Sequence, residues 1–277
     1  MEINRDNIVE IVKKSNAHPE KDYGQNFLIE ASASSDIANL LEANDSDNVL
    51  EIGPGLGSLT HFLVGKGHLS VCDIDSRMID FLKIIYQNEI EYILNDVRKI
   101  NVSNYDLIVG NLPYNITTEL VTFLLLNANK CRRMVLMCQQ EAFNRFFDVS
   151  GKDYGPVSVL IHLLGESKKC MTLKPGCFYP APKCNSLVFT LDIDLSVDKN
   201  LMISVYKLAK SLFLNRRKTI YNNLKNYLKD TDKAEQILSS LNIEKNKRPE
   251  DISPIMFLNI YKKIWCCIIK QETLWNQ

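Results

Sequence analysis

Between Asp47 and Leu191, short apolar runs alternate with helical patterns, and this alternation restricts the fold more than any other feature of the chain. Strands that alternate with helices form a mainly parallel sheet with helices on both faces. The expected strands are Asn48–Ile52, Leu69–Cys72, Tyr92–Leu94, Leu107–Val109, Met134–Cys138, Cys170–Leu173 and Ser186–Leu191. The helices between them are expected over residues 58–66, 76–86, 117–129, 139–147 and 155–165. The sequence therefore predicts an α/β fold with a seven-stranded sheet. Its last two strands have no helix between them and are expected to form an antiparallel pair at one edge.

After Asp194 the alternation stops, and the remaining sequence has only helical patterns. These helices are expected over residues 199–214, 216–229, 232–240 and 253–268. A helix-only stretch that follows an α/β unit marks a domain boundary. We therefore expect one domain over residues 1–196 and a small all-helical domain over residues 197–277.

The net charge of the chain is zero, but the two charge types are segregated along it. Residues 22–112 contain 14 acidic and 5 basic side chains, whereas residues 205–248 contain 11 basic and 4 acidic ones. A polyanion would be attracted to the second stretch and repelled by the first. Ordinary solvated helix faces would give the same pattern, so charge alone leaves both interpretations open.

The histidines and cysteines have no pattern of a metal site. The four His are isolated, and no two of the eight Cys form a C-x-x-C pair. The N-terminus is acidic without an apolar signal core, and no apolar run reaches the roughly 18 residues of a membrane span. These features predict a cytoplasmic protein with reduced thiols and neither a metal nor a membrane segment. We expect it to be a monomer.

The run Val49–Gly57 is an apolar strand that leads into three glycines, followed by an expected helix. Glycines at such a turn allow a sharp bend and let a ligand approach the backbone, which makes Gly53 and Gly55 candidate cofactor residues. The third glycine comes one residue too early for the dinucleotide pattern G-x-G-x-x-G. A tight turn without a ligand is the alternative.

Acidic residues follow the next two expected strands. Asp73 lies 20 residues after Gly53, where a carboxylate can accept the hydroxyls of a ribose, and Asp96 is placed to accept the amine of an adenine ring. The stretch has no P-loop Lys, and its acids would repel a pyrophosphate. A nucleoside without phosphates fits better, and S-adenosylmethionine is one whose sulfonium cation tolerates an acidic pocket. Each acid taken alone is more often a solvated strand end than a ligand, but in succession at the ends of strands they line one crevice.

Asn111-Leu112-Pro113-Tyr114 stands at the end of the fourth expected strand, in the same crevice. The Asn111 amide oxygen and the Leu112 carbonyl can accept the two hydrogens of an exocyclic adenine amine, which favours a more nucleophilic nitrogen. Pro113 holds the backbone out of helical geometry, and Tyr114 offers a ring for a base to stack on. Direct methyl transfer to an adenine amine requires no general base. A plain turn built from Asn and Pro is the alternative.

Several motifs together resemble the ribosomal RNA adenine dimethyltransferases. They run in order through the chain: Gly24-Gln25-Asn26-Phe27-Leu28, Glu51–Gly57, Asn111–Thr118, Gln140-Glu141 with Arg145, Tyr154-Gly155, Phe178–Lys183 and Arg216-Arg217-Lys218. The resemblance implies a class I, Rossmann-like methyltransferase domain with a helical C-terminal domain. It also implies dimethylation of two adjacent adenosines near the 3′ end of small-subunit rRNA, in ribosome biogenesis.

The resemblance also implies roles for individual residues. Cofactor contacts are implied for Asn26, Leu28, Gly53, Asp73, Asp96 and Asn111. Asn111, Leu112 and Tyr114 would hold the target adenine, and Phe178 would close on its other face, since two stacking faces help to offset the cost of extruding a base. RNA phosphates would be met by Arg216, Arg217, Lys218 and Lys225. The chain departs from the family in having Asp73 where Glu is usual and Glu119 where Pro is frequent.

Two other functions remain as alternatives. One is the erythromycin-resistance branch of the same fold, which methylates large-subunit rRNA. Against it are Gly24–Leu28, Pro54–Gly57 and Arg248–Pro254, which are nearer to the small-subunit type. The other is a ribosome-assembly or transcription factor without catalysis, which the complete Asn111–Tyr114 set argues against.

Overall fold

The computed structural model describes residues 3–14, 25–113 and 116–275. These residues fall into two compact units. Met1–Phe143 and Glu166–Leu195 make up the first, here called the sheet unit, and Asn144–Gly165 and Ser196–Gln277 make up the second, here called the helical unit. The helical unit therefore includes a stretch that precedes the expected boundary near residue 196.

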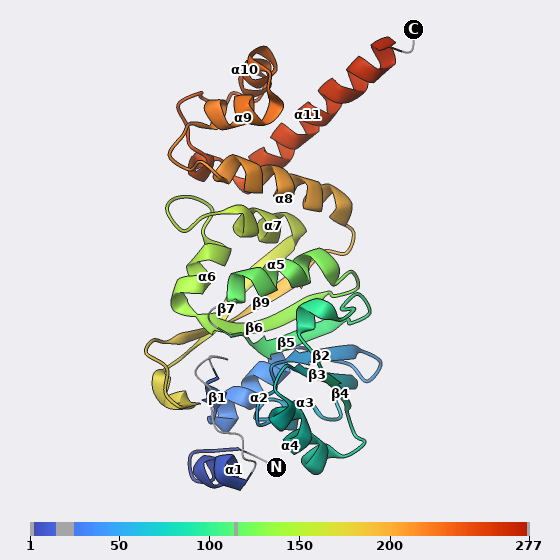
Figure 1. Cartoon of the computed structure of the whole chain (residues 1–277), viewed down its shortest axis with the longest axis vertical. Helices are drawn as coiled ribbons and strands as arrows, with labels where there is room; N and C mark the ends of the chain where they lie inside the picture. Colours follow the sequence, from blue (N-terminus) through green and yellow to red (C-terminus); the bar gives the residue numbers. More distant parts are fainter. Residues whose placement is uncertain (1–2, 15–24, 114–115, 276–277) are drawn as a thin grey trace. The chain divides into compact units, whose positions relative to one another are not determined.

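The sheet unit is built on a seven-stranded sheet with the strand order β4-β3-β2-β5-β6-β9-β7 (Figure 1). Its strands are β2 (Asn48–Ile52), β3 (His68–Asp73), β4 (Glu91–Leu94), β5 (Leu107–Asn111), β6 (Arg133–Gln139), β7 (Gly165–Leu173) and β9 (Ser186–Ile193). The pairs β4–β3, β3–β2, β2–β5 and β5–β6 are parallel, and β9 is antiparallel to β6. The prediction of a mainly parallel, seven-stranded sheet is confirmed.

Two further strands lie apart from this sheet. Phe27–Leu28 (β1) pairs antiparallel with Phe178–Tyr179 (β8), with Leu28 opposite Phe178. The sequence analysis did not predict this pair, because two-residue strands some 150 positions apart have no periodicity to detect. The pairing places Asn26, which immediately precedes β1, beside the ends of the parallel strands.

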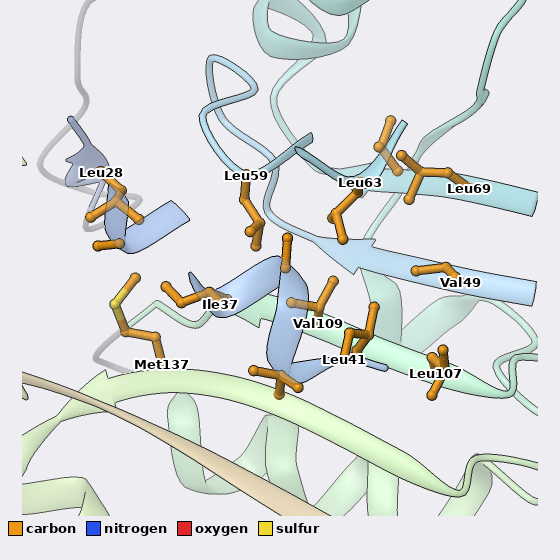
Figure 2. Packing of buried hydrophobic residues seen from close by; sticks show 14 of the residues in the cluster. Leu28, Ile37, Leu41, Val49, Leu59, Leu63, Leu69, Leu107, Val109 and Met137 are labelled. Carbon is orange, nitrogen blue, oxygen red and sulfur yellow. The ribbon is translucent and has the colours of Figure 1, made fainter. Parts of the chain in front are cut away.

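The helices of the sheet unit are α1 (Ile8–Lys14), α2 (Ala31–Leu40), α3 (Thr60–Leu63), α4 (Ser76–Tyr86), α5 (Thr117–Asn127) and the first half of α6 (Gln140–Phe147). Short 3₁₀ turns lie at Val97–Lys99 and Pro175–Cys177. Helices α1 and α2 were not expected. Figure 2 shows Ile37 of α2 in one hydrophobic cluster with Val109 of β5. Burial of this cluster stabilises the strands whose ends carry the site.

The helical unit contains α7 (Pro156–Leu164), α8 (Lys199–Phe213), α9 (Ile220–Leu228), α10 (Thr231–Ser240) and α11 (Pro254–Trp275), with a 3₁₀ turn at Pro249–Asp251. Its centre is aromatic. The fully buried Tyr154 meets Phe213 edge to face, and Phe213 stacks on Phe257 at 5.6 Å between ring centroids. The Tyr154 hydroxyl donates to the carbonyl of Ile252 at 2.9 Å, so the buried phenol keeps a polar partner.

None of the helices in the described part of the chain is long and apolar enough to cross a membrane. Within the same residues, no group of His, Cys, Asp and Glu side chains is arranged to hold a metal ion, and every cysteine is a free thiol.

Candidate active site

The carboxyl ends of β2, β3 and β5 open into one cavity of the sheet unit. Of the residues predicted from the sequence, the cavity is lined by Asn26, Leu28, Gly53, Gly55, Asp73, Asn111, Leu112 and Pro113. Parallel strands bring their ends to one edge of a sheet, which explains why residues from position 51 to position 113 meet there. The antiparallel pair of β1 and β8 adds Asn26 and Leu28. The described lining contains two carboxylic acids, Glu51 and Asp73, and no Lys, Arg or His.

The turn after β2 depends on its glycines. Gly53 and Gly55 have φ angles of +64° and +55°, in the left-handed region that side chains disfavour. A Cβ atom on Gly55 would lie 2.9 Å from the ring of Phe27. The glycine turn is therefore in close contact with the first residue of β1. The glycines thus let the backbone form one wall of the cavity.

Asp73 ends β3, with its side chain nearly buried against the glycine turn. Its carboxylate accepts hydrogen bonds from the backbone N–H of Asp75 at 3.0 Å and of Gly55 at 3.4 Å. Burial raises the pKa of Asp73 to about 6, although these N–H groups oppose the effect. A carboxylate held at the cavity wall in this way can accept hydrogen bonds from the hydroxyl groups of a bound ligand.

Asn111 is the last residue of β5 and lies half-buried at the cavity. Its Nδ2 atom donates to the backbone carbonyl of Asn26 at 3.0 Å. That bond holds the amide in one orientation, and within the described residues its Oδ1 atom accepts no hydrogen bond. Next to it, Leu112 is buried and its N–H donates to the carbonyl of Met137 at 3.0 Å. The end of β5 thus brings an amide side chain with one fixed hydrogen bond to the wall of the cavity.

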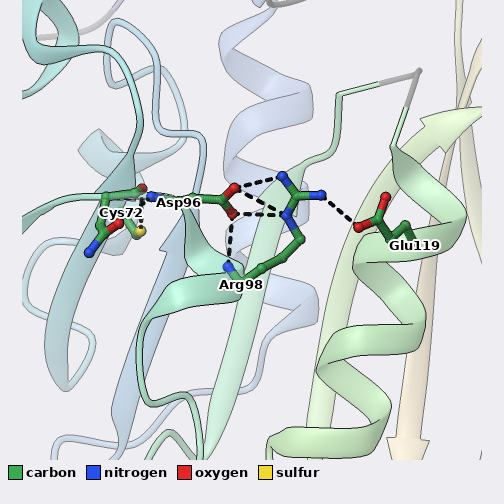
Figure 3. A network of polar contacts seen from close by, with 5 residues as sticks. Cys72, Asp96, Arg98 and Glu119 are labelled. Atoms are coloured by element: carbon green, nitrogen blue, oxygen red, sulfur yellow. Dashed lines mark hydrogen bonds and ion pairs between the residues drawn. The ribbon is translucent and has the colours of Figure 1, made fainter.

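Asp96 is not among the residues that line the cavity. Figure 3 shows its carboxylate gripped by Arg98, whose backbone N–H, Nε and Nη2 atoms all donate to it, with the shortest contact at 2.6 Å. Arg98 also pairs with Glu119 of α5 at 2.7 Å. The guanidinium lowers the pKa of Asp96 and binds both of its carboxylate oxygens. Acceptance of an adenine amine by Asp96 stays a prediction, and it requires Arg98 to give up some of these bonds.

Phe178 is the other described residue of the predicted site that does not line the cavity. Phe178 is only 3% exposed and packs in the hydrophobic cluster that contains Leu28. Its ring is therefore part of the core, and stacking on a base stays a prediction for it. Tyr114 lies outside the described residues.

The predicted RNA-binding residues differ in their surroundings. Arg216 is fastened within the helical unit: its Nη2 atom meets Glu250 at 2.8 Å and the carbonyl of Gly151 at 2.9 Å, and its Nη1 atom meets the carbonyl of Lys152 at 2.7 Å. These bonds engage most of the guanidinium donors that a phosphate would need. The other three residues, Arg217, Lys218 and Lys225, are exposed.

Sequence reasoning gave no role to Glu51. It is the last residue but one of the buried strand β2 and is only 1% exposed, yet it reaches the cavity. A single acid in an otherwise apolar strand was the available signal, because a buried carboxyl is costly unless it has a purpose or a partner.

The chain matches the family model for "Ribosomal RNA adenine dimethylase" over residues 16–265. The curated protein "Ribosomal RNA small subunit methyltransferase A" of Malacoplasma penetrans is 32% identical, covering 91% of this chain and 94% of that protein. Its namesake from Mesoplasma florum is 33% identical over 88% of this chain and 97% of that protein. The crystal structure of a dimethyladenosine transferase from Plasmodium falciparum is similar with a TM-score of 0.74 and 25% identity, covering 84% of this chain and 95% of that one.

Proposed function

The chain belongs to the ribosomal RNA adenine dimethylase family, and from this premise we propose that it methylates two adjacent adenosines near the 3′ end of small-subunit rRNA, with S-adenosylmethionine as the donor. The product is N6-dimethyladenosine, formed during small-subunit biogenesis. We propose that this activity takes place in the cytoplasm. The relatives that carry a small-subunit name favour this function over the large-subunit alternative.

The placement of Asn111 carries the chemical part of the proposal. Its Nδ2 atom donates to the carbonyl of Asn26, which leaves its Oδ1 atom as the acceptor that this cavity-lining residue can offer a ligand. This oxygen can accept a hydrogen bond from an adenine amine, with the Leu112 carbonyl as the second acceptor. Both acceptors draw electron density toward the nitrogen and orient its lone pair, and positioning of this kind supplies much of the rate in a direct displacement.

The residues present fit a cationic nucleoside as the donor. The glycine turn gives backbone access, Asp73 is placed as an acceptor for ribose hydroxyls, and the lining carries acids without a described cation. When bound, S-adenosylmethionine supplies an activated methyl group on a positively charged sulfur. Asn26, Leu28 and Gly53 would hold it beside Asn111, while Leu28 and other apolar groups exclude water.

Labelled methyl transfer tests the proposal. The purified protein is incubated with S-adenosylmethionine carrying a labelled methyl group and with small or large ribosomal subunits that lack the modification. We expect label in the RNA of the small subunits and none in the large ones. Label confined to large-subunit RNA would move the function to the resistance type, and label in neither would contradict an rRNA substrate.

We also propose that Arg217, Lys218 and Lys225 contact RNA phosphates, while Arg216 mainly supports the turn that carries Arg217 and Lys218. The double variant Arg217→Gln/Lys218→Gln should keep the melting temperature, bind small subunits more weakly and reduce the salt slope of binding by about 2. Arg216→Gln should instead cost about 1–2 kcal/mol of stability, since it removes bonds to Glu250 and two carbonyls from a partly exposed site. Binding titrations at several salt concentrations, with thermal melts, separate the two roles. An unchanged salt slope in the double variant would place the RNA elsewhere.

A further inference from the structure

Glu51 is a buried carboxylic acid on β2 that the proposed chemistry does not use. Its only hydrogen-bond donor among the described residues is Thr60, which opens α3 and donates through Oγ1 to Oε2 at 2.7 Å. It has no ion pair within those residues. Burial is the largest influence on it and raises the pKa of Glu51 to about 8, so the acid is mostly protonated near neutral pH.

A second buried acid faces the same cavity from the neighbouring strand. In the parallel register of β2 and β3, Glu51 is opposite Val71, so Asp73 comes two residues further along its strand. A charge on Asp73 raises the pKa of Glu51 further. The two acids therefore oppose each other's ionisation. Glu51 is the one that stays protonated, because backbone N–H groups stabilise the ionised form of Asp73.

The other titratable groups packed around Glu51 are not cations. Tyr86 approaches from α4, and burial together with the charge on Glu51 raises the pKa of its phenol. On the β5 side the cavity wall is Gly110 and Asn111, which carry no charge. A positive charge that could balance an ionised Glu51 must therefore come, among the described surroundings, from a ligand in the cavity.

We propose that Glu51 makes the cavity selective for a cationic ligand, so that the protein binds the positively charged methyl donor in preference to the neutral thioether left after transfer. A sulfonium in the cavity stabilises the ionised carboxylate, and the acid releases its proton to solvent as the donor binds. The thioether keeps the α-ammonium group that both ligands share but has no charge on its sulfur, so with it in the cavity the carboxyl releases less of its proton. This inference rests on S-adenosylmethionine being the donor.

Proton linkage gives the inference a direct signature. At a pH below the pKa of Glu51, the carboxyl group of Glu51 must release its proton before it can stabilise the bound cation. The affinity for the donor therefore rises with pH, by up to roughly tenfold per pH unit for one released proton, and levels off above that pKa. The affinity for the neutral thioether rises less with pH. Measurements between about pH 6.5 and 9 keep Asp73, with its pKa of about 6, mostly ionised throughout.

Calorimetry of the whole protein tests this with S-adenosylmethionine and S-adenosylhomocysteine as probes. Titrations in two buffers of different ionisation enthalpy give the number of protons exchanged. We expect the wild-type protein to release more protons with the donor than with the thioether at neutral pH, and the ratio of the two affinities to increase with pH. Equal proton release for both ligands would overturn the inference. This comparison uses the wild-type protein alone.

Glu51→Gln supplies the second arm, since the amide still accepts from Thr60 but cannot titrate. We expect the affinity ratio in this variant to become independent of pH and to fall below the wild-type ratio at high pH. Glu89→Gln, at an exposed glutamate of the same unit, is the matched control and should behave as wild type. If Glu51→Gln does not fold, Thr60→Val replaces it. Loss of the Thr60 hydroxyl, which lowers the pKa of Glu51, should shift the rise in donor affinity to higher pH.

The outcomes separate this inference from the proposed function. If both ligands bind with the same pH dependence, or if Glu51→Gln keeps the wild-type pH dependence, Glu51 does not select for charge, although the donor is still S-adenosylmethionine. If neither ligand binds, the proposed donor is wrong and the inference falls with it.

Discussion

Replacing Asn111 by Ala should reduce methyl transfer by roughly 100- to 1,000-fold, while S-adenosylmethionine still binds. The variant removes the amide oxygen that accepts the target amine and the Nδ2 atom that donates to the carbonyl of Asn26. Since Asn111 provides only part of the cavity lining, the other walls remain for the donor. Single-turnover transfer to small subunits measures the first effect, and calorimetric titration of the donor measures the second.

A second variant at the same position separates the two functions of the amide. Asn111→Asp keeps an acceptor oxygen but loses the donor to Asn26, so the side chain is no longer held toward the cavity. We expect its transfer rate to lie between those of Asn111→Ala and the wild type. Asn88→Ala, at an exposed asparagine outside this cavity, is the control for loss of an amide. Turnover at the wild-type rate in Asn111→Ala would mean that the amine is held by other residues.

Gly110→Ala should have the second large effect, because it should lower both the affinity for the methyl donor and the stability of the fold. A Cβ atom at this position would lie 2.6 Å from the carbonyl oxygen of Ile52, a distance that real Cβ atoms do not reach. The strands β5 and β2 would have to separate there, at the point where one carries Asn111 and the other leads into the glycine turn. We expect a loss of about 1–3 kcal/mol in stability and at least a tenfold loss in donor affinity.

Gly155→Ala is the matched control for this change. Gly155 has an extended backbone, and a Cβ atom on it would meet nothing within 4 Å. Thermal melts and donor titrations of both variants give the comparison. If Gly110→Ala melts and binds the donor as Gly155→Ala does, the strands tolerate the extra carbon and the close approach of β5 to β2 is not needed for the site.

The parallel sheet could be predicted because its strands are apolar, regularly spaced and separated by helices. The cavity-lining residues on that sheet followed from the same regularity, since strand ends in such a fold converge. Helix α2 was missed because Ala31–Leu40 begins with a run of small Ala and Ser residues and has no strong apolar stripe. Its helical form comes from the burial of Ile37 and Ala38 against the sheet, which the local sequence does not show.

The remaining differences concern side-chain partners rather than elements. Asp96 and Arg98 are two positions apart, and a carboxylate can bind the backbone N–H and the side chain of such a neighbour, which the strand-end argument overlooked. Arg216 was grouped with Arg217 by sequence proximity, but its partner Glu250 is 34 positions away. Phe178 has a partner strand that only the folded chain reveals. Spacing along a sequence indicates which residues are near a strand end, and not which neighbour has already engaged them.

The nucleosides of small-subunit RNA test the central claim most directly. RNA from small subunits treated with the protein and S-adenosylmethionine is digested and its nucleosides are identified by mass spectrometry, while fragments locate the modified positions. We predict N6-dimethyladenosine at two adjacent adenosines near the 3′ end, with none formed by Asn111→Ala. Methyl groups on ring carbons, on ribose or on bases other than adenine would contradict the proposed chemistry, and dimethyladenosine only in large-subunit RNA would contradict the proposed substrate.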